Sequence, residues 1–185
     1  MMKVNQRERG YSLTELLVVL AIIGIFSLIT VPQFMSMYRS GLVKGSMREF
    51  TSSLRKARQL AATRNERVRV RFKKAASGTT IQIERGGTDP LNPTWVVMSP
   101  TRKLDPTTYI DSSTTLPTTS GFAEVNFLPN GSAVDSPSAG TMPSTLTTDN
   151  NTVIIRSSWK NMTYNQYTVV VGTSGQLTVT PSKWR

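Results

Sequence analysis

The chain has 185 residues but contains neither cysteine nor histidine. Without cysteine it cannot form a disulfide bond or offer a thiolate as a nucleophile or metal ligand. Without histidine it has no histidine general base, no Ser-His-Asp triad and no histidine metal ligand. The eleven acidic residues include no close pair in sequence, and no glycine-rich phosphate loop or calcium loop is present. We therefore predict no catalytic residue, no metal site and no cofactor.

Acidic residues are also half as common as basic ones. The chain has 22 Lys and Arg against 11 Asp and Glu, so its formal net charge is +11. Such an excess bears on partners and solubility rather than on the fold. It suits an anionic partner such as nucleic acid or lipid phosphate, although a generally basic surface has the same composition.

Charge is absent from one long segment near the N-terminus. No residue from Leu16 to Val31 is charged. The 21 residues from Tyr11 to Val31 would measure about 30 Å as a helix, which matches the hydrocarbon core of a bilayer. We therefore predict a transmembrane helix over residues 11–32.

A short basic leader precedes this segment and ends at Gly10. An ordinary secretory signal has its apolar region before the cleavage site. Cleavage after Gly10 would instead leave the apolar helix on the mature protein and lower the net charge to +9. The cations Lys3, Arg7 and Arg9 favour a cytoplasmic N-terminus, with the rest of the chain across the membrane. A plain signal anchor would share these features.

Two residues of the apolar helix point beyond simple anchoring. Glu15 is an ionisable group in apolar surroundings, where a carboxylate needs a partner. It lies four residues after Tyr11, on the same face of a helix, so the amino group freed by cleavage could pair with Glu15 of its own or a neighbouring chain. Pro32 lacks a backbone N–H and should kink the helix.

An amphipathic pattern follows Pro32. Apolar residues recur at a spacing of three or four, which predicts a helix over residues 33–65 with one face on a sheet. This stripe consists of Val43, Met47, Phe50, Leu54, Ala57 and Ala61. Arg48, Arg55, Arg58 and Arg64 fall off the stripe, so a basic face should look outward.

The pattern changes to alternation at Arg67. A strand with one apolar and one basic face is predicted from Arg67 to Lys73. Further strands are expected at Ile81–Ile83, Trp95–Met98, Ala123–Phe127, Val153–Ile155, Tyr167–Val171 and Leu177–Val179. The fold class is therefore α+β, with a long N-terminal helix packed on an antiparallel sheet in a β-rich region over residues 67–185.

The leader closely resembles the prepilin leader of type IV pilins and type II secretion pseudopilins. This resemblance implies that prepilin peptidase cleaves after Gly10 and methylates the new amino group of Tyr11. Glu15 matches the glutamate that acts in filament assembly, and Pro32 matches the helix-kinking proline of that group. Tyr11 stands where Phe or Met is usual.

The head is similar to that of the GspH/FimT group of minor pilins and pseudopilins. Residues 47–72 contain a Leu-x-x-Ala-Arg core, then Arg-Asn and an alternating strand. Phe127-Leu-Pro-Asn-Gly131 is similar to the Phe-x-Pro-x-Gly turn of that group, and Val-Val-Val-Gly…Gly-Gln-Leu-Thr-Val to its closing hairpin.

The resemblance implies a minor pilin or pseudopilin of a type IV pilus or type II secretion pseudopilus, acting in filament assembly or priming. The expected organisation is a leader (residues 1–10), the transmembrane helix and a periplasmic head (33–185). The expected location is the bacterial inner membrane or a filament. The expected partners are prepilin peptidase, other pilin subunits and the inner membrane. A membrane-anchored periplasmic enzyme is an alternative of another class, but it lacks a catalytic constellation.

A second alternative is a DNA-binding minor pilin that acts in DNA uptake. The basic strand favours it, and so does a tail in which two cations flank an aromatic residue that could stack on a base. The candidate DNA-binding residues are Arg64, Arg67, Arg69, Arg71, Lys73, Lys183, Trp184 and Arg185. Outward cations on a strand also block edge-to-edge aggregation, which is the simpler interpretation.

Overall fold

The computed structural model describes residues 11–75, 78–87, 94–111, 114–116, 118–119, 121–135, 146, 151–159 and 165–183. These residues form one helix and eleven strands. The chain divides into two compact units, Met1–Tyr38 and Arg39–Arg185, and we call the second unit the head.

The helix α1 extends from Leu13 to Arg64, with Pro32 inside it. It begins two residues after Tyr11, and Ser12, just before its first residue, is a favourable N-cap because it carries a hydroxyl group. The expectation that Tyr11 and Glu15 share a helical face is therefore wrong, because Tyr11 precedes the helix. The kink at Pro32 stays a prediction.

The helix ends where the chain enters a left-handed conformation. Asn65 has φ 52°, a conformation that asparagine tolerates better than most residues. The N–H of Glu66 donates to the carbonyl of Ala61 at 3.3 Å. This is the long bond of a Schellman cap, and it stops the helix next to the expected end.

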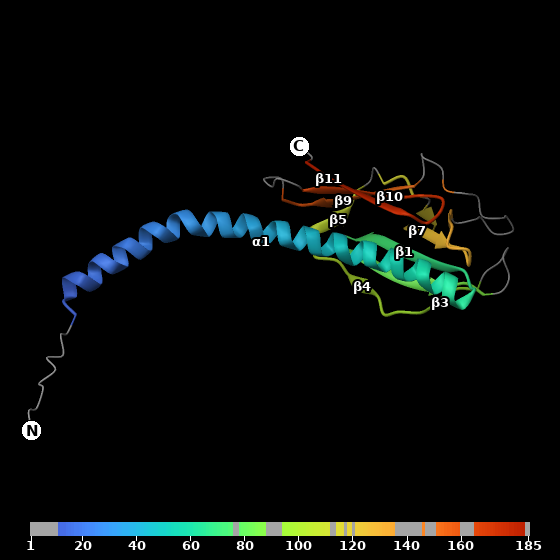
Figure 1. Cartoon of the computed structure of the whole chain (residues 1–185), viewed down its shortest axis with the longest axis horizontal. Coiled ribbons are helices and arrows are strands. Elements are labelled where there is room, and N and C mark those ends of the chain that lie inside the picture. Colours follow the sequence, from blue (N-terminus) through green and yellow to red (C-terminus); the bar gives the residue numbers. More distant parts are fainter. Residues whose placement is uncertain are drawn as a thin grey trace, which may run out of the picture. The chain divides into compact units, whose positions relative to one another are not determined.

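The head contains two antiparallel sheets (Figure 1). The first has the order β3-β2-β1-β7-β6, with β4 also paired to β2 and β8 to β7. Its strands are β1 (Val68–Ala75), β2 (Gly78–Arg85), β3 (Val96–Val97), β4 (Arg102–Lys103), β6 (Thr118–Thr119), β7 (Phe122–Phe127) and β8 (Ala133–Val134).

The second sheet has the order β11-β10-β9-β5. Its strands are β5 (Thr108–Ile110), β9 (Thr152–Ser157), β10 (Gln166–Val171) and β11 (Leu177–Ser182). The α+β class is confirmed, but two sheets are present where one was expected. β10 pairs with β9 and β11, and β1 pairs with β2 and β7, so the two groups of strands hydrogen-bond separately.

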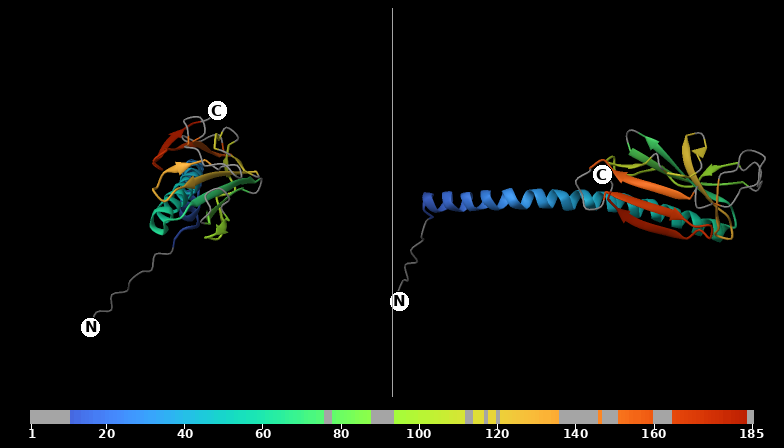
Figure 2. Two further views of the ribbon diagram at one scale, coloured as in Figure 1. Left: turned by 90° about the vertical axis from the view of Figure 1, so that its right-hand side faces the viewer. Right: turned by 90° about the horizontal axis from the view of Figure 1, so that it is seen from above.

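A single hydrophobic core joins α1 to both sheets, and Figure 2 shows the strands of the head lying along this part of the helix. The predicted helix stripe is confirmed, because every member from Val43 to Ala61 is at most 5% exposed. Phe50 packs edge-to-face on Phe72 of β1, with ring centroids 5.2 Å apart. The alternating apolar residues of β1, β7, β9 and β10 complete the core.

Arg58 ties the helix to two turns. Its Nε donates to the carbonyl of Gly131 at 3.1 Å, and its Nη2 donates to the carbonyl of Ser174 at 2.9 Å. A Cβ on Gly175 would lie 2.2 Å from the Gly131 oxygen, so this close approach requires glycine. The arginine of the Leu-x-x-Ala-Arg core, the turn at 127–131 and the hairpin at 172–175 thus meet at one point. The three sequence patterns that resemble the GspH/FimT group therefore contact one another in the folded head.

Candidate functional site: the assembly helix and the charged faces of the head

The N-terminal part of α1 exposes its apolar side chains. Residues such as Leu13, Phe26 and Leu28 are between 67 and 77% exposed. Within the described residues, α1 is long and apolar enough to cross a membrane. An apolar surface of this length needs lipid or the helices of other chains to cover it.

Glu15 lies in the first turn of α1 and is the one acidic residue there. Ser12, Leu13, Thr14 and Glu15 match the S-x-x-E capping-box pattern, and a carboxylate near a helix N-terminus is favourable to the helix dipole. The Glu15 side chain is exposed, so it is available to a cation outside the unit. Gly10, the residue before the expected cleavage point, lies outside the described residues.

The basic face of β1 is largely buried, which corrects the expectation that it looks outward. Arg67 and Arg69 are each 8% exposed, and the Arg71 side chain is 17% exposed. Of the four predicted cations on this strand, Lys73 alone is exposed. The strand therefore presents no open row of four cations to a phosphate backbone.

Two glutamates from the neighbouring strands neutralise this face. Arg69 pairs with Glu84 of β2 at 2.6 Å and with Glu124 of β7 at 3.2 Å. Arg71 lies 3.8 Å from Glu84 and 3.9 Å from Glu124. The register explains the contacts, because Arg69 is directly opposite Glu84 and Arg71 directly opposite Glu124.

Aromatic rings cover the same arginines. The guanidinium carbon of Arg69 lies 3.9 Å from the centre of the Trp95 ring, and that of Arg71 lies 4.2 Å from Phe122. Burial lowers the pKa of Arg69, although the hydrogen bond that Arg69 donates to Glu84 and the charge of Glu124 raise it. Burial also lowers the pKa of Arg67. Both guanidinium groups stay charged at neutral pH, because an arginine begins from a very high pKa.

The remaining DNA candidates do not form one site. Arg64 ends α1, whereas Lys183 follows β11. β11 begins beside Arg58 and Gln59 and runs toward the opposite end of the head from Arg64 (Figure 2). Trp184 and Arg185 lie outside the described residues.

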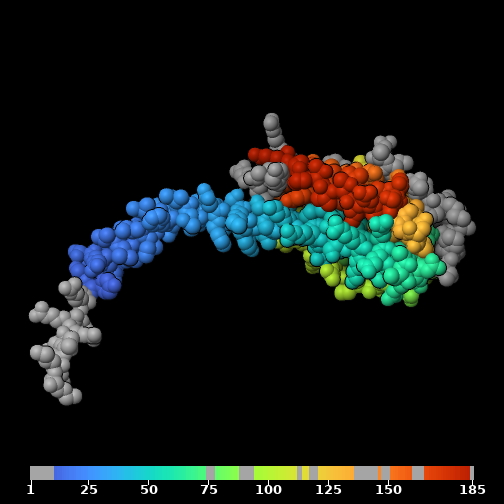
Figure 3. All heavy atoms as spheres, in the orientation of Figure 1, coloured from blue at the N-terminus to red at the C-terminus, as the bar shows by residue number. Residues whose placement is uncertain are grey.

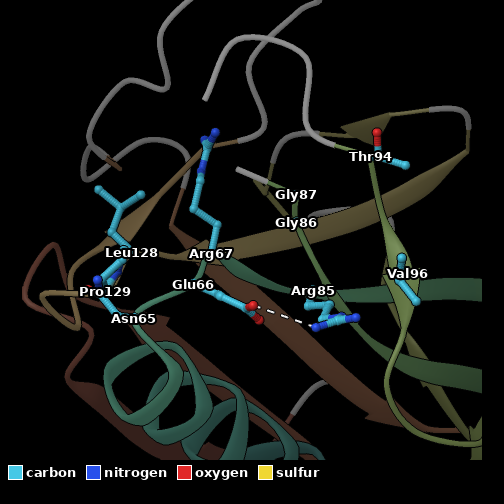
Figure 4. A pocket seen from close by; sticks show the side chains of 10 residues that line it. All are labelled: Asn65, Glu66, Arg67, Arg85, Gly86, Gly87, Thr94, Val96, Leu128 and Pro129. Atoms are coloured by element: carbon cyan, nitrogen blue, oxygen red, sulfur yellow. Dashed lines mark ion pairs between the residues drawn. The ribbon is translucent and has the colours of Figure 1, made fainter. Parts of the chain in front are cut away.

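A cleft of about 600 Å³ lies at the C-terminal end of α1 (Figure 4). Glu66 points across it toward Arg85, and their charged atoms are 3.6 Å apart. Gly86, Thr94 and Leu128 also line it. A half-exposed ion pair among backbone, polar and apolar groups offers no pairing of a nucleophile with a base, so the described lining does not suggest catalysis.

The exposed cations of the head gather on α1, a feature that analysis of the strands missed. The helix faces solvent along one side in the head (Figure 3). Exposed cations on that side are Lys44, Arg48, Arg55 and Lys56. The sequence indicated this face, because Arg48 and Arg55 fall off the apolar stripe.

Comparison with known proteins identifies two family matches. The prokaryotic N-terminal methylation motif matches residues 5–31. The family described as type II transport protein GspH matches residues 46–181. A search of the curated proteins found no match.

Among solved structures, the chain is similar to the minor pseudopilin EpsH from the type 2 secretion system of Vibrio cholerae. The two share 14% sequence identity with a TM-score of 0.50, and the likeness covers 75% of this chain and 96% of the other. At this identity the likeness shows a shared fold.

Proposed function

Because the chain belongs to the GspH family of type II transport proteins, we propose that it is a minor pilin or pseudopilin subunit that helps to assemble or prime a thin filament. The observation that carries this proposal is the union of a GspH head with an N-terminal methylation motif. A transport protein that does not enter a filament would not need an apolar helix that stays on the chain after the leader is removed. The type II secretion pseudopilus and the type IV pilus are both filaments of this kind.

The proposed mechanism follows from the exposure of α1. Prepilin peptidase removes residues 1–10 and methylates Tyr11, and the apolar part of α1 holds the subunit in the inner membrane with its head in the periplasm. On assembly, apolar helices of neighbouring subunits replace the lipid. Glu15 then accepts the positive N-terminal amine of a neighbour, which sets the register between subunits. No step requires a catalytic group, so we propose a non-enzymatic role.

The DNA-uptake alternative has less support in the described residues. Its strongest argument was the basic row on β1, and three of those four cations are wholly or largely buried. Lys73, Lys183 and Arg64 remain exposed, but they belong to separate elements. That Trp184 and Arg185 bind DNA stays a prediction.

Processing can be tested by mass spectrometry of the mature N-terminus. We expect the chain to begin at Tyr11 and to carry one added methyl group. A mature protein that begins at Met1, or one cut beyond Val31, would refute the proposed function.

Assembly can be tested with Glu15→Ala in the full chain. We expect normal membrane insertion and a folded head, but poor incorporation into sheared filaments, because a buried amine without its carboxylate is strongly unfavourable. Glu66→Ala is the control, since it removes a half-buried carboxylate that pairs with Arg85 just after the C-terminal end of α1. Equal incorporation of the two variants would remove the assembly role of Glu15.

A further inference from the structure

The solvent-facing side of α1 in the head carries cations without salt bridges to any other described residue. We call Lys44, Arg48, Arg55 and Lys56 the basic strip. All four are exposed. Lys44, Arg48 and Arg55 follow one another after about one and about two helical turns, which puts them on one side of the helix, and Lys56 adjoins Arg55. The strip differs in this respect from Arg69 and Arg71, whose charges are met by Glu84 and Glu124.

The head itself supplies little negative charge to the strip. Glu49 is the one acidic residue of α1 between Gly41 and Arg64. It is committed elsewhere, because it accepts a hydrogen bond from Arg102 of β4 at 2.5 Å. The strip therefore keeps its full positive charge on the folded surface.

The shape of this side favours a partner that lies along the helix. Small residues lie at its N-terminal end, where a Cβ added at Gly41 or Gly45 would meet nothing within 4 Å. An open groove of about 330 Å³ follows, lined by Arg48, Ser52, Lys56 and their neighbours. In this groove the small side chain of Ser52 lies between Arg48 and Lys56, which leaves room for a partner that lies along the helix.

We propose that the basic strip docks an acidic helix of a second, different pilin-like subunit. A second copy that presented the same four cations would be repelled, whereas the carboxylates of an acidic helix would complement the charge of the strip. The proposal rests on the proposed function, under which the part of α1 before Tyr38 already packs on neighbouring subunits. The strip begins shortly afterwards in the same helix.

The first test uses the full chain in its native membrane. A photoreactive amino acid at Ser52, an exposed position within the strip, is activated in intact cells, and the adduct is identified by mass spectrometry. We expect an adduct with an Asp- or Glu-rich helical segment of another pilin-like subunit. Changing those acidic residues to lysine should reduce the yield of the adduct. Combining that partner variant with a strip whose cations are changed to glutamate should restore the yield.

Two charge-reversal variants carry the same crosslinker. R48E/R55E/K56E alters the strip, while K73E/K103E/K183E makes the same change of charge at exposed positions outside α1. Each exposed ion pair contributes a factor of about 1.5 to 5 to an affinity, so the strip variant should lower the adduct yield about tenfold. The control should stay within about twofold, and protease resistance of both heads checks that each is folded.

Three results would overturn the proposal: an unchanged yield in the strip variant, an adduct with a second copy of the chain, or an adduct with DNA. A gel shift with a 30-base-pair duplex separates the last case. Failure of the proposed function would look different, because wild-type protein would then lack cleavage at Gly10 or would be absent from filaments. A processed and incorporated protein without the adduct would refute the strip alone.

Discussion

Replacing Arg69 with methionine would remove the cation at the centre of the buried charge cluster. Arg69 contacts Glu84 at 2.6 Å, Glu124 at 3.2 Å and the Trp95 ring at 3.9 Å. Glu124 is fully buried, so it could not turn to water when Arg69 is lost, and the cation left beside it, Arg71, lies 3.9 Å away, beyond hydrogen-bond distance. Breaking a buried ion pair in this way costs about 3–5 kcal/mol.

The size of this effect makes it easy to measure. A domain of this size unfolds with about 5–15 kcal/mol, so the variant would lose a large share of its stability. A change of 1 kcal/mol shifts the melting temperature of such a domain by about 3–4 °C. A soluble fragment that begins at Arg39 contains the whole compact head, and we expect Arg69→Met to lower its melting temperature by about 10–20 °C.

The matched control is Lys73→Met on the same strand face. Lys73 is exposed, with its Nζ 5.3 Å from the Phe122 ring, and a surface substitution of this kind usually costs no more than about 0.5 kcal/mol. Arg69→Met combined with Glu124→Gln should cost less than the sum of the single changes, because the two side chains interact directly. Equal melting temperatures for the Arg69 and Lys73 variants would refute the buried cluster.

Three further predictions concern the head. Phe50→Ala should cost about 3–5 kcal/mol in urea unfolding, because the ring is fully buried against Phe72; a loss below about 1 kcal/mol would contradict that packing. Gly175→Ala should destabilise the same fragment by more than the backbone strain of about 1–3 kcal/mol, since Gly175 has φ 75° and no room for a Cβ. Gly121→Ala is the control, because Gly121 has φ 76° but lies in open space, so its substitution measures the backbone strain without the clash. Gly45→Ala should raise the free energy of unfolding by about 1 kcal/mol, because this exposed helical position has space for a methyl group, and a lower melting temperature would contradict it.

The sequence was sufficient to predict the elements of the head and the face that each buries. Apolar residues spaced by three or four on the helix, and by two on β1, β7 and β10, specify one buried side in each element. Phe50, Val70 and Val169 were all assigned to the core in this way, and all are fully buried. Alternation is a property of each strand's own sequence, so the buried face can be predicted without knowing which strands pair with it.

The division into two sheets could not be predicted in the same way. Pairing depends on which strands meet, and β1 meets β7 from across about fifty residues. The short strands β3, β4, β6 and β8 contain two residues each, too few to show a period. Their positions follow from contacts with longer strands rather than from their own sequences.

The charged face of β1 shows a second limit. Alternation placed Arg67, Arg69 and Arg71 correctly on one side, but it cannot say what covers that side. The cover comes from Glu84 on β2 and Glu124 on β7, together with Trp95 and Phe122. Arginine is well suited to such a site, because its flat guanidinium group can stack on a ring while it donates to two carboxylates.

The buried cluster changes where the positive charge of this protein can act. Arg69 and Arg71 meet Glu84 and Glu124, so these four residues add nothing to the net charge of +11. The surplus must then lie on other cations, and among the described residues the exposed side of α1 carries a continuous group of them. A charge that pairs inside the head can stabilise or destabilise it, whereas a charge left on the helix can recruit a partner. The excess positive charge therefore supports an interaction through α1 rather than through β1. The helix is also the element through which a filament subunit packs on its neighbours.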